Sequence, residues 1–68
     1  MNKYNIGDLV EMKDGVIGII ILKNEETSNR FHYRVKWFDP NNRYFSSQND
    51  YTLDVYIKKH YPIKKENI

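Results

Sequence analysis

The fold is decided by residues 31–38, which read Phe-His-Tyr-Arg-Val-Lys-Trp-Phe. Two sets of side chains alternate along this stretch: Phe31, Tyr33, Val35 and Trp37 in one, and His32, Arg34, Lys36 and Phe38 in the other. An alternation of period two in aromatic and β-branched residues is typical of a strand with one buried face and one solvated face. The stretch therefore predicts a central strand whose first set of side chains faces the core.

Trp37 is predicted to be the largest buried side chain of the domain, because it shares its phase with Tyr33 and Val35. Its expected neighbours are Val35, Leu9 and the Val16–Leu22 segment. Phe38 has the opposite phase, so it is expected on the solvated face. That face also carries the basic side chains of the stretch, which either solvate it or form a stripe that meets an anionic partner.

The other predicted strands are short. They are Leu9–Lys13, Val16–Leu22, Arg43–Ser47 and Val55–Ile57. Turns are expected at Asp14-Gly15 and at Asp39–Asn42, from residues that tolerate positive φ or fix φ. Lys23–Arg30 is predicted to be a polar loop and Tyr51–Asp54 a single helical turn.

Together these segments predict an all-β fold, a small five-stranded antiparallel barrel with one helical turn before the last strand. Gly18, inside the β-branched segment, suggests a bend or bulge where the sheet curls. The 68 residues allow one domain, which we expect over residues 1–60, and Pro62 ends any ladder. Residues 61–68 are expected to form a flexible basic tail.

Charge and cysteine content limit the kinds of function. The net charge is +2, but residues 1–55 hold seven Lys/Arg against eight Asp/Glu, so the positive excess lies in residues 56–68. A nearly neutral body is weak support for nucleic-acid binding, which depends on neutralised phosphates. There is no cysteine, hence no disulfide and no thiolate metal site. No apolar run approaches the length of a membrane span.

Two segments resemble a known group of domains. Gly7-Asp8-Leu9-Val10 followed by Asp14–Ile20 is similar to the opening hairpin of Src-homology-3-like barrels, especially the KOW type. Tyr33–Asp39 is similar to a strand of small barrels encoded by tailed bacteriophages. The resemblance covers roughly residues 5–58 and implies the fold more strongly than a function, since one fold hosts many functions.

The resemblance implies three kinds of activity. KOW-type barrels bind RNA, or polymerase and ribosomal partners, through the first hairpin, which here is not basic. Tudor-type barrels hold methylated lysine or arginine in an aromatic cage. The rings available for such a cage are Trp37, Phe38, Tyr44 and Phe45. Phage-type barrels bind protein surfaces as virion or accessory proteins.

The residue inventory favours binding over catalysis. His32 and His60 are the only histidines, and neither has a Cys, His or carboxylate at metal-ligand spacing. His60 is expected to lie among tail lysines. Ser46-Ser47 has no histidine and acid placed to form a triad, and there is no glycine-rich phosphate loop. We therefore expect no enzyme activity, no cofactor and no metal.

Two hypotheses follow from the sequence. In the first, the chain is an interaction module, such as a phage virion or accessory protein, that docks on a larger protein assembly or on a host protein. Its expected location is cytoplasmic or virion-associated, and self-association is an open alternative. Its expected contacts are exposed rings: Phe38, Tyr51, Tyr56 and Tyr61.

The alternative is a KOW-like domain that binds nucleic acid. Its expected contacts are His32, Arg34, Lys36, Arg43, Lys58 and Lys59, with Arg43 across a hairpin from Arg34 and Lys36.

Overall fold

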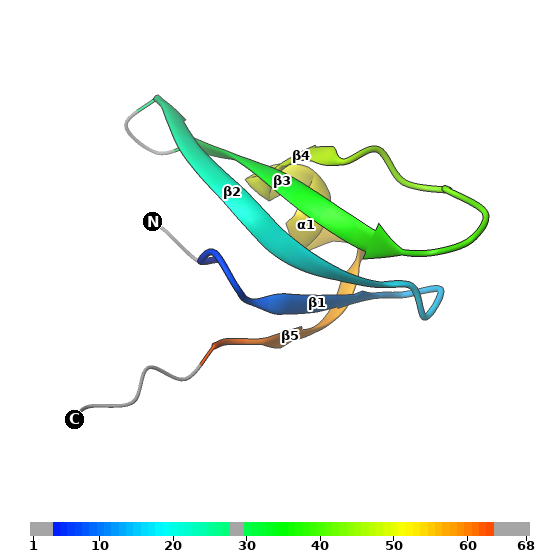
Figure 1. Ribbon diagram of the computed structural model, residues 1–68. Helices are drawn as coiled ribbons and strands as arrows, with labels where there is room; N and C mark the ends of the chain where they lie inside the picture. Colours follow the sequence, from blue (N-terminus) through cyan, green and yellow to red (C-terminus); the bar gives the residue numbers. More distant parts are fainter. Residues whose placement is uncertain (1–3, 28–29, 64–68) are drawn as a thin grey trace.

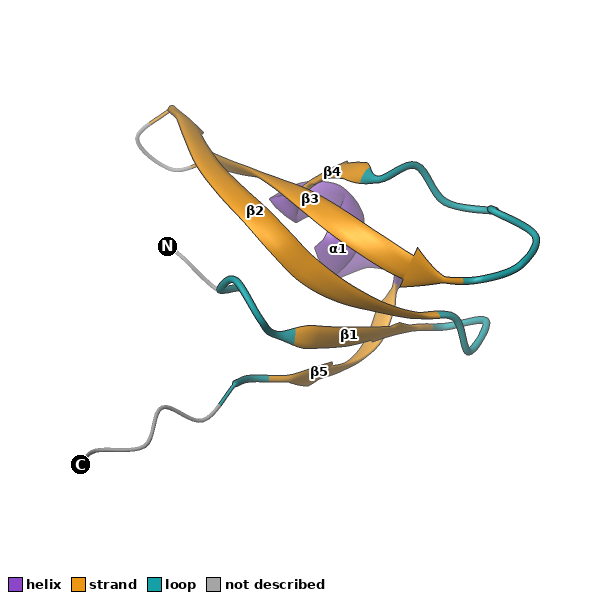
Figure 2. Cartoon of the chain, in the orientation of Figure 1, coloured by secondary structure: helices purple, strands orange, loops and turns teal. Residues whose placement is uncertain are grey.

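The computed structural model describes residues 4–27 and 30–63 as one antiparallel sheet of five strands with a short helix before the last strand (Figures 1 and 2). The elements are β1 Leu9–Met12, β2 Ile17–Thr27, β3 Arg30–Phe38, β4 Ser47–Asn49, α1 Asp50–Tyr56 and β5 Ile57–Tyr61. The strand order is β4-β3-β2-β1-β5, and α1 packs behind the sheet against β3 and β4. The predicted all-β class, with five antiparallel strands and a helix before the last strand, is confirmed.

The longest hairpin joins β2 to β3, and it extends further than the sequence predicted. The prediction of a polar loop over Lys23–Arg30 is wrong, because pairing continues through Glu25↔Phe31 to Thr27↔Arg30. Backbone ladder hydrogen bonds do not require apolar side chains. A polar segment can therefore extend a strand beyond the edge of the core.

The bulge in β2 lies after Ile20 and not at Gly18. Gly18 pairs regularly with Trp37 on one side and with Val10 on the other, whereas the register shifts between Ile20 and Leu22. The extra residue reverses which side chains face the core, because side-chain direction alternates along a strand. Ile20 is buried, and Leu22 is exposed opposite Arg34.

The absence of a side chain at Gly18 lets Trp37 and Val35 pack closely against β2. A Cβ at this position would lie 2.5 Å from Cε3 of Trp37 and 2.6 Å from Cγ1 of Val35. Contacts this short force neighbouring side chains to shift, so Gly18→Ala is expected to lower the free energy of unfolding by about 1–3 kcal/mol. Urea denaturation measures the loss. The penalty should shrink in a Trp37→Leu background, and an equal penalty in both backgrounds would contradict this packing.

The segment between β3 and β4 is a loop, and the predicted strand Arg43–Ser47 is wrong. The turn itself lies where expected: Asn42 has φ 49°, and its N–H donates to the Asp39 carbonyl over 3.2 Å. The buried Asp39 carboxylate accepts the backbone N–H groups of Asn41 and Arg43 over 3.1 and 3.0 Å. These bonds satisfy amides that would otherwise seek a strand partner.

Helix α1 is longer than the single turn predicted. The Asn49 side chain caps it by accepting the Thr52 N–H over 2.8 Å, and Leu53 is its buried residue. The longer helix places β5 at Ile57–Tyr61, so the prediction of a strand over Val55–Ile57 is wrong in its position. β5 ends directly before Pro62, as expected. The predicted flexible tail lies mainly outside the described residues.

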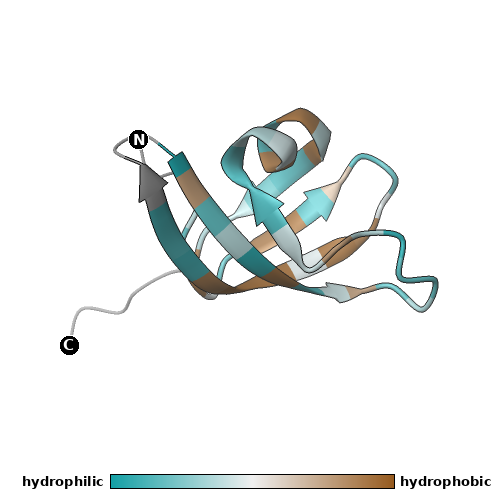
Figure 3. Cartoon of the chain, turned by 90° about the horizontal axis from the view of Figure 1, so that it is seen from above, coloured by the Kyte–Doolittle hydropathy of each residue, from teal (hydrophilic) through white to brown (hydrophobic). Residues whose placement is uncertain are grey.

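The core lies between the inner face of the sheet and α1. Its buried apolar residues are Tyr4, Val10, Met12, Val16, Ile20, Tyr33, Val35 and Leu53. Figure 3 shows hydrophobic and hydrophilic residues alternating along the strands. The predicted phase of β3 is confirmed, since Tyr33 and Val35 are buried while Arg34 and Lys36 are exposed.

Trp37 is not the largest buried side chain; Tyr4 and Tyr33 are. Trp37 is partly buried at the edge of the core, where its Nε1–H donates to the Phe45 carbonyl over 2.8 Å. Its ring lies 4.9 Å from that of Tyr44. An indole N–H needs a partner when it leaves water, and this one fastens the β3–β4 loop. Leu9, predicted beside Trp37, is exposed on the opposite face of β1.

The Tyr33 hydroxyl is buried without a hydrogen-bond partner among the residues described. Burial raises the pKa of this hydroxyl above its ordinary value, and the nearby backbone N–H of Tyr4, which lacks the geometry of a hydrogen bond, offsets only part of that rise. An unpaired buried hydroxyl costs about 1–3 kcal/mol, so Tyr33→Phe should leave the free energy of unfolding unchanged or raise it by up to about 2 kcal/mol. Tyr4→Phe is the matched control, since it removes a hydroxyl that is bonded. A clear loss of stability in Tyr33→Phe, measured by urea denaturation, would refute this expectation.

Candidate docking surface

The outer face of the sheet, away from α1, carries apolar side chains in two adjacent rows. Cross-strand pairing builds each row, because directly paired residues point to the same side. One row runs Phe38, Ile17, Glu11 and Lys59, and the next runs Lys36, Ile19, Leu9 and Tyr61. We call the five apolar members the outer patch: Leu9, Ile17, Ile19, Phe38 and Tyr61.

The outer patch is exposed in the folded chain. Phe38 is 57% exposed, Tyr61 41%, Ile17 40% and Leu9 38%, and Ile19 is half-buried between them. Charged residues from the same two rows flank it, namely Lys36, Glu11 and Lys59. An apolar centre with a polar rim is the arrangement found in protein–protein interfaces.

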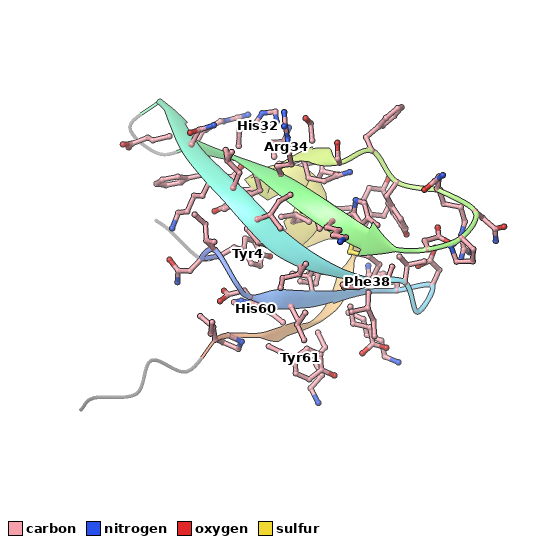
Figure 4. All side chains as sticks on the ribbon, viewed as in Figure 1. Tyr4, His32, Arg34, Phe38, His60 and Tyr61 are labelled. Carbon is pink, nitrogen blue, oxygen red and sulfur yellow. The ribbon has the colours of Figure 1, made fainter. Side chains whose placement is uncertain are left out.

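Tyr61 is held in place on this face by its neighbours. Its hydroxyl donates to Oε1 of Glu11 over 3.3 Å, and Nζ of Lys59 lies 5.2 Å from the centre of its ring. Figure 4 shows Tyr61 below β5 and Phe38 at the far end of β3 from His32 and Arg34. A ring fixed before binding loses less entropy on association.

The rings predicted as contacts fall into two groups. Phe38 and Tyr61 belong to the outer patch, whereas Tyr51 and Tyr56 are exposed on α1. Leu9, Ile17 and Ile19 were not predicted from the sequence. Ile17 and Ile19 lie in a segment that is apolar on both faces, so alternation does not show which face points outward. Leu9 lies on the same face of its strand as the charged Glu11, whereas Val10 lies on the same face as Met12, so the sequence did carry a signal for Leu9.

The aromatic cage that the Tudor resemblance implies is not brought together. Trp37 and Tyr44 are neighbours, but Phe38 faces the outer side of β3, opposite to Trp37. Phe45 is among the most exposed side chains.

The basic stripe on β3 is shorter than predicted. Arg34 and Lys36 are exposed on the outer face, and His32 is half-buried beside them. Arg43 does not face them, because it binds Asp39 over 3.1 Å and approaches Asp14 at 3.6 Å. The Arg43 hydrogen bonds hold the pKa of Asp39 below its usual value. The positive charge of Arg43 is thus compensated by Asp39 and Asp14, at the end of β3 away from Arg34.

Lys58 and Lys59, also predicted for nucleic acid, lie on β5. In the sheet, β2 and β1 separate that strand from β3. The basic residues predicted to bind nucleic acid are therefore spread over the sheet. They do not line up along one path that a phosphate backbone could follow.

An open pocket of about 350 Å³ lies beyond the outer patch, on the same face. It is lined by Leu22, Asn24, His32, Arg34 and Ser47. These residues are cross-strand neighbours, because His32 pairs with Asn24 and Arg34 pairs with both Leu22 and Ser47. Figure 4 shows His32 and Arg34 side by side near β4. The lining combines several hydrogen-bond donors with one apolar side chain.

A second polar cluster is buried and joins the two ends of the domain. The Asp8 carboxylate is fully buried and accepts from the Asn5 and Ile63 amides, each over 2.9 Å. Nε2 of His60 lies 2.6 Å from Oδ2 of Asp8, so His60 faces a carboxylate and not the tail lysines. Burial raises the pKa of Asp8, but the hydrogen bonds from Ile63, His60 and Asn5 outweigh it and hold the pKa below its usual value. We call this cluster the clasp, because it ties the segment before β1 to the segment after β5.

Within the described part of the chain, no group of three or more His, Cys, Asp or Glu side chains is arranged to hold a metal ion. No helix there is long and apolar enough to cross a membrane.

Comparisons of the chain with protein families, with curated proteins and with solved structures gave no match.

Proposed function

We propose that the chain is a non-catalytic interaction module that docks through the outer patch on a larger protein assembly. The observation that carries the proposal is the run of exposed and half-buried apolar side chains across four neighbouring strands, β3, β2, β1 and β5. Phe38 and Tyr61 are the largest of them, and large aromatic residues supply much of the binding energy at the centres of interfaces. The charged residues around the patch give a partner a way to select one orientation.

A bacteriophage particle is the assembly that we favour. Two features favour it: the resemblance of the Tyr33–Asp39 motif to a strand of small phage-encoded barrels, and a strand order compatible with a small barrel. The spread of the basic residues gives the nucleic-acid alternative less support.

Phe38→Asp is the variant that tests the proposal. Phe38 is exposed, so the change should alter the free energy of unfolding by no more than about 0.5 kcal/mol. Placing a charge at the most exposed ring of the outer patch should abolish capture of partner proteins from the native context. The readout is a pull-down quantified against the unmodified chain, with light scattering to detect self-association through the same patch.

Tyr51→Asp is the matched control, because Tyr51 is an exposed aromatic residue on α1, away from the outer patch. It should retain full capture. If both variants capture the same proteins as the unmodified chain, or if the unmodified chain captures none and stays monomeric, the outer patch is not a docking surface.

A further inference from the structure

We infer that the pocket on the outer face binds a carboxylate of the docking partner, presented beside an apolar side chain. This role of the pocket rests on the proposed function in one respect only, namely that the ligand is a segment of a protein. The pocket lies at the β4 end of the sheet, next to the outer patch on the same face.

The pocket is built to accept an anion. Arg34, Asn24 and Ser47 line it, and the side chain of each can donate hydrogen bonds. None of the described lining residues carries a carboxylate. Among the described side chains, which do not include those of residues 26–29, no acidic group forms an ion pair with Arg34, in contrast to Arg43. A guanidinium binds a carboxylate through two parallel hydrogen bonds, so Arg34 is the residue that selects the ligand.

The apolar part of the pocket favours a peptide over nucleic acid. Leu22 lines the pocket, and the bulge leaves the adjacent Ile21 exposed as well. A phosphate backbone gains nothing from these side chains. Nucleic-acid binding also needs several uncompensated cations along one track, and Arg43 is compensated.

The position of the pocket fits an extended segment. Arg34 and Lys36 are two residues apart on the same face of β3, about 7 Å along the strand. Ile19, which pairs with Lys36, belongs to the outer patch. A segment anchored by its carboxylate at Arg34 therefore reaches the outer patch with its next residues.

The test is a titration of the whole chain with short peptides, followed by backbone amide chemical shifts. The probe is acetyl-Leu-Glu-Leu-amide, and its glutamine counterpart is the control. The glutamate peptide should shift the amides of Asn24, Arg34 and Ser47 and bind roughly 10- to 100-fold more tightly than the glutamine peptide. A peptide with a free C-terminal carboxylate and no glutamate distinguishes the two sources of the anion; tighter binding by it would assign the pocket to a chain end.

Variants separate the pocket from general electrostatics. Arg34→Gln should remove the preference for glutamate, and Leu22→Ser should weaken both peptides. Lys36→Gln, two residues along the same face and outside the pocket, should change affinity by no more than about threefold. An effect of Lys36→Gln as large as that of Arg34→Gln would overturn the assignment of the pocket.

Two further outcomes overturn the inference. One is the absence of any shift at the pocket with either carboxylate source. The other is tighter binding of oligothymidylate than of the peptides, falling steeply between about 50 mM and 200 mM salt, which would assign the face to nucleic acid. Neither outcome bears on the Phe38→Asp experiment, which measures capture through the outer patch.

Discussion

Asp8→Ala is expected to lower the free energy of unfolding by about 3–5 kcal/mol, the range found when one partner of a buried charged network is removed. The change leaves the amides of Asn5 and Ile63 and the ring of His60 without their acceptor. These groups come from both ends of the chain, so their loss frees the segments before β1 and after β5. Urea denaturation followed by circular dichroism measures the effect.

Asp8→Asn and Glu25→Gln define what the carboxylate itself contributes. The asparagine keeps the shape and one acceptor oxygen, so its loss should be smaller than that of Asp8→Ala. Glu25 is exposed and has no ion pair among the described residues, so Glu25→Gln should change stability by no more than about 0.5 kcal/mol. If Asp8→Ala unfolds at the same urea concentration as Glu25→Gln, the clasp does not stabilise the domain.

The contribution of Asp8 should depend on pH in one direction. Its pKa is lower in the folded chain than in the unfolded chain, where a carboxyl of this kind titrates near about 3.9. Its stabilisation is therefore present above about pH 4 and is lost as the pH falls through the folded-state pKa. The difference in stability between the native chain and Asp8→Asn should shrink as the pH falls below about 4. A difference that grows as the pH falls through this range would contradict the direction of the pKa shift.

Tyr4→Ala is the second change with a large expected effect, a loss of about 3–5 kcal/mol, as for other aromatic residues truncated in a core. Tyr4 is fully buried although it precedes the first strand. Its ring meets Tyr33 edge-on at 5.5 Å and lies 4.8 Å from the ring of His60. Its hydroxyl donates to Oδ1 of Asp54 on α1 over 2.6 Å, so one side chain joins β3, β5 and the helix.

A loss of this size approaches the total stability expected for a small domain, so Tyr4→Ala should be largely unfolded in the absence of denaturant. Tyr4→Phe keeps the ring and removes only the bond to Asp54, with an expected loss of about 1.5–3 kcal/mol. Tyr51→Ala, on the exposed side of α1, should be nearly neutral. If Tyr4→Ala unfolds at nearly the same urea concentration as the native chain, the core is stable without the Tyr4 ring.

Where the two faces of a segment differed in polarity, the sequence predicted the structure well. The phase of β3 is the clearest case, because Arg34 and Lys36 could lie only on the solvated side of Tyr33 and Val35. The turn at Asp14-Gly15 was equally readable, and Gly15 has φ 92° in the structure. The helix before the last strand and the end of β5 at Pro62 followed from local chemistry in the same way.

Where both faces are apolar, alternation carries no information about direction. Ile19, Ile20 and Ile21 could each have faced the core. Only pairing with neighbouring strands, together with the bulge after Ile20, decides which of them point outward. Ile17 and Ile19 of the outer patch were missed for this reason, although the sequence did indicate the exposure of Phe38 and Tyr61.

The sequence by itself determined the fold class, the phase of the central strand and the sites of the tight turns, because each depends on residues close together in the chain. The tertiary structure decided what fills the core, what the outer face presents and how the ends are joined. Trp37 stays at the edge because its indole N–H needs the Phe45 carbonyl, and Tyr4 takes the central place that Trp37 was expected to hold. The contacts of Tyr4 with Asp54 and of Asp8 with His60 join residues about fifty positions apart. No local pattern encodes such pairs, since they form only when the sheet and α1 bring the two ends together.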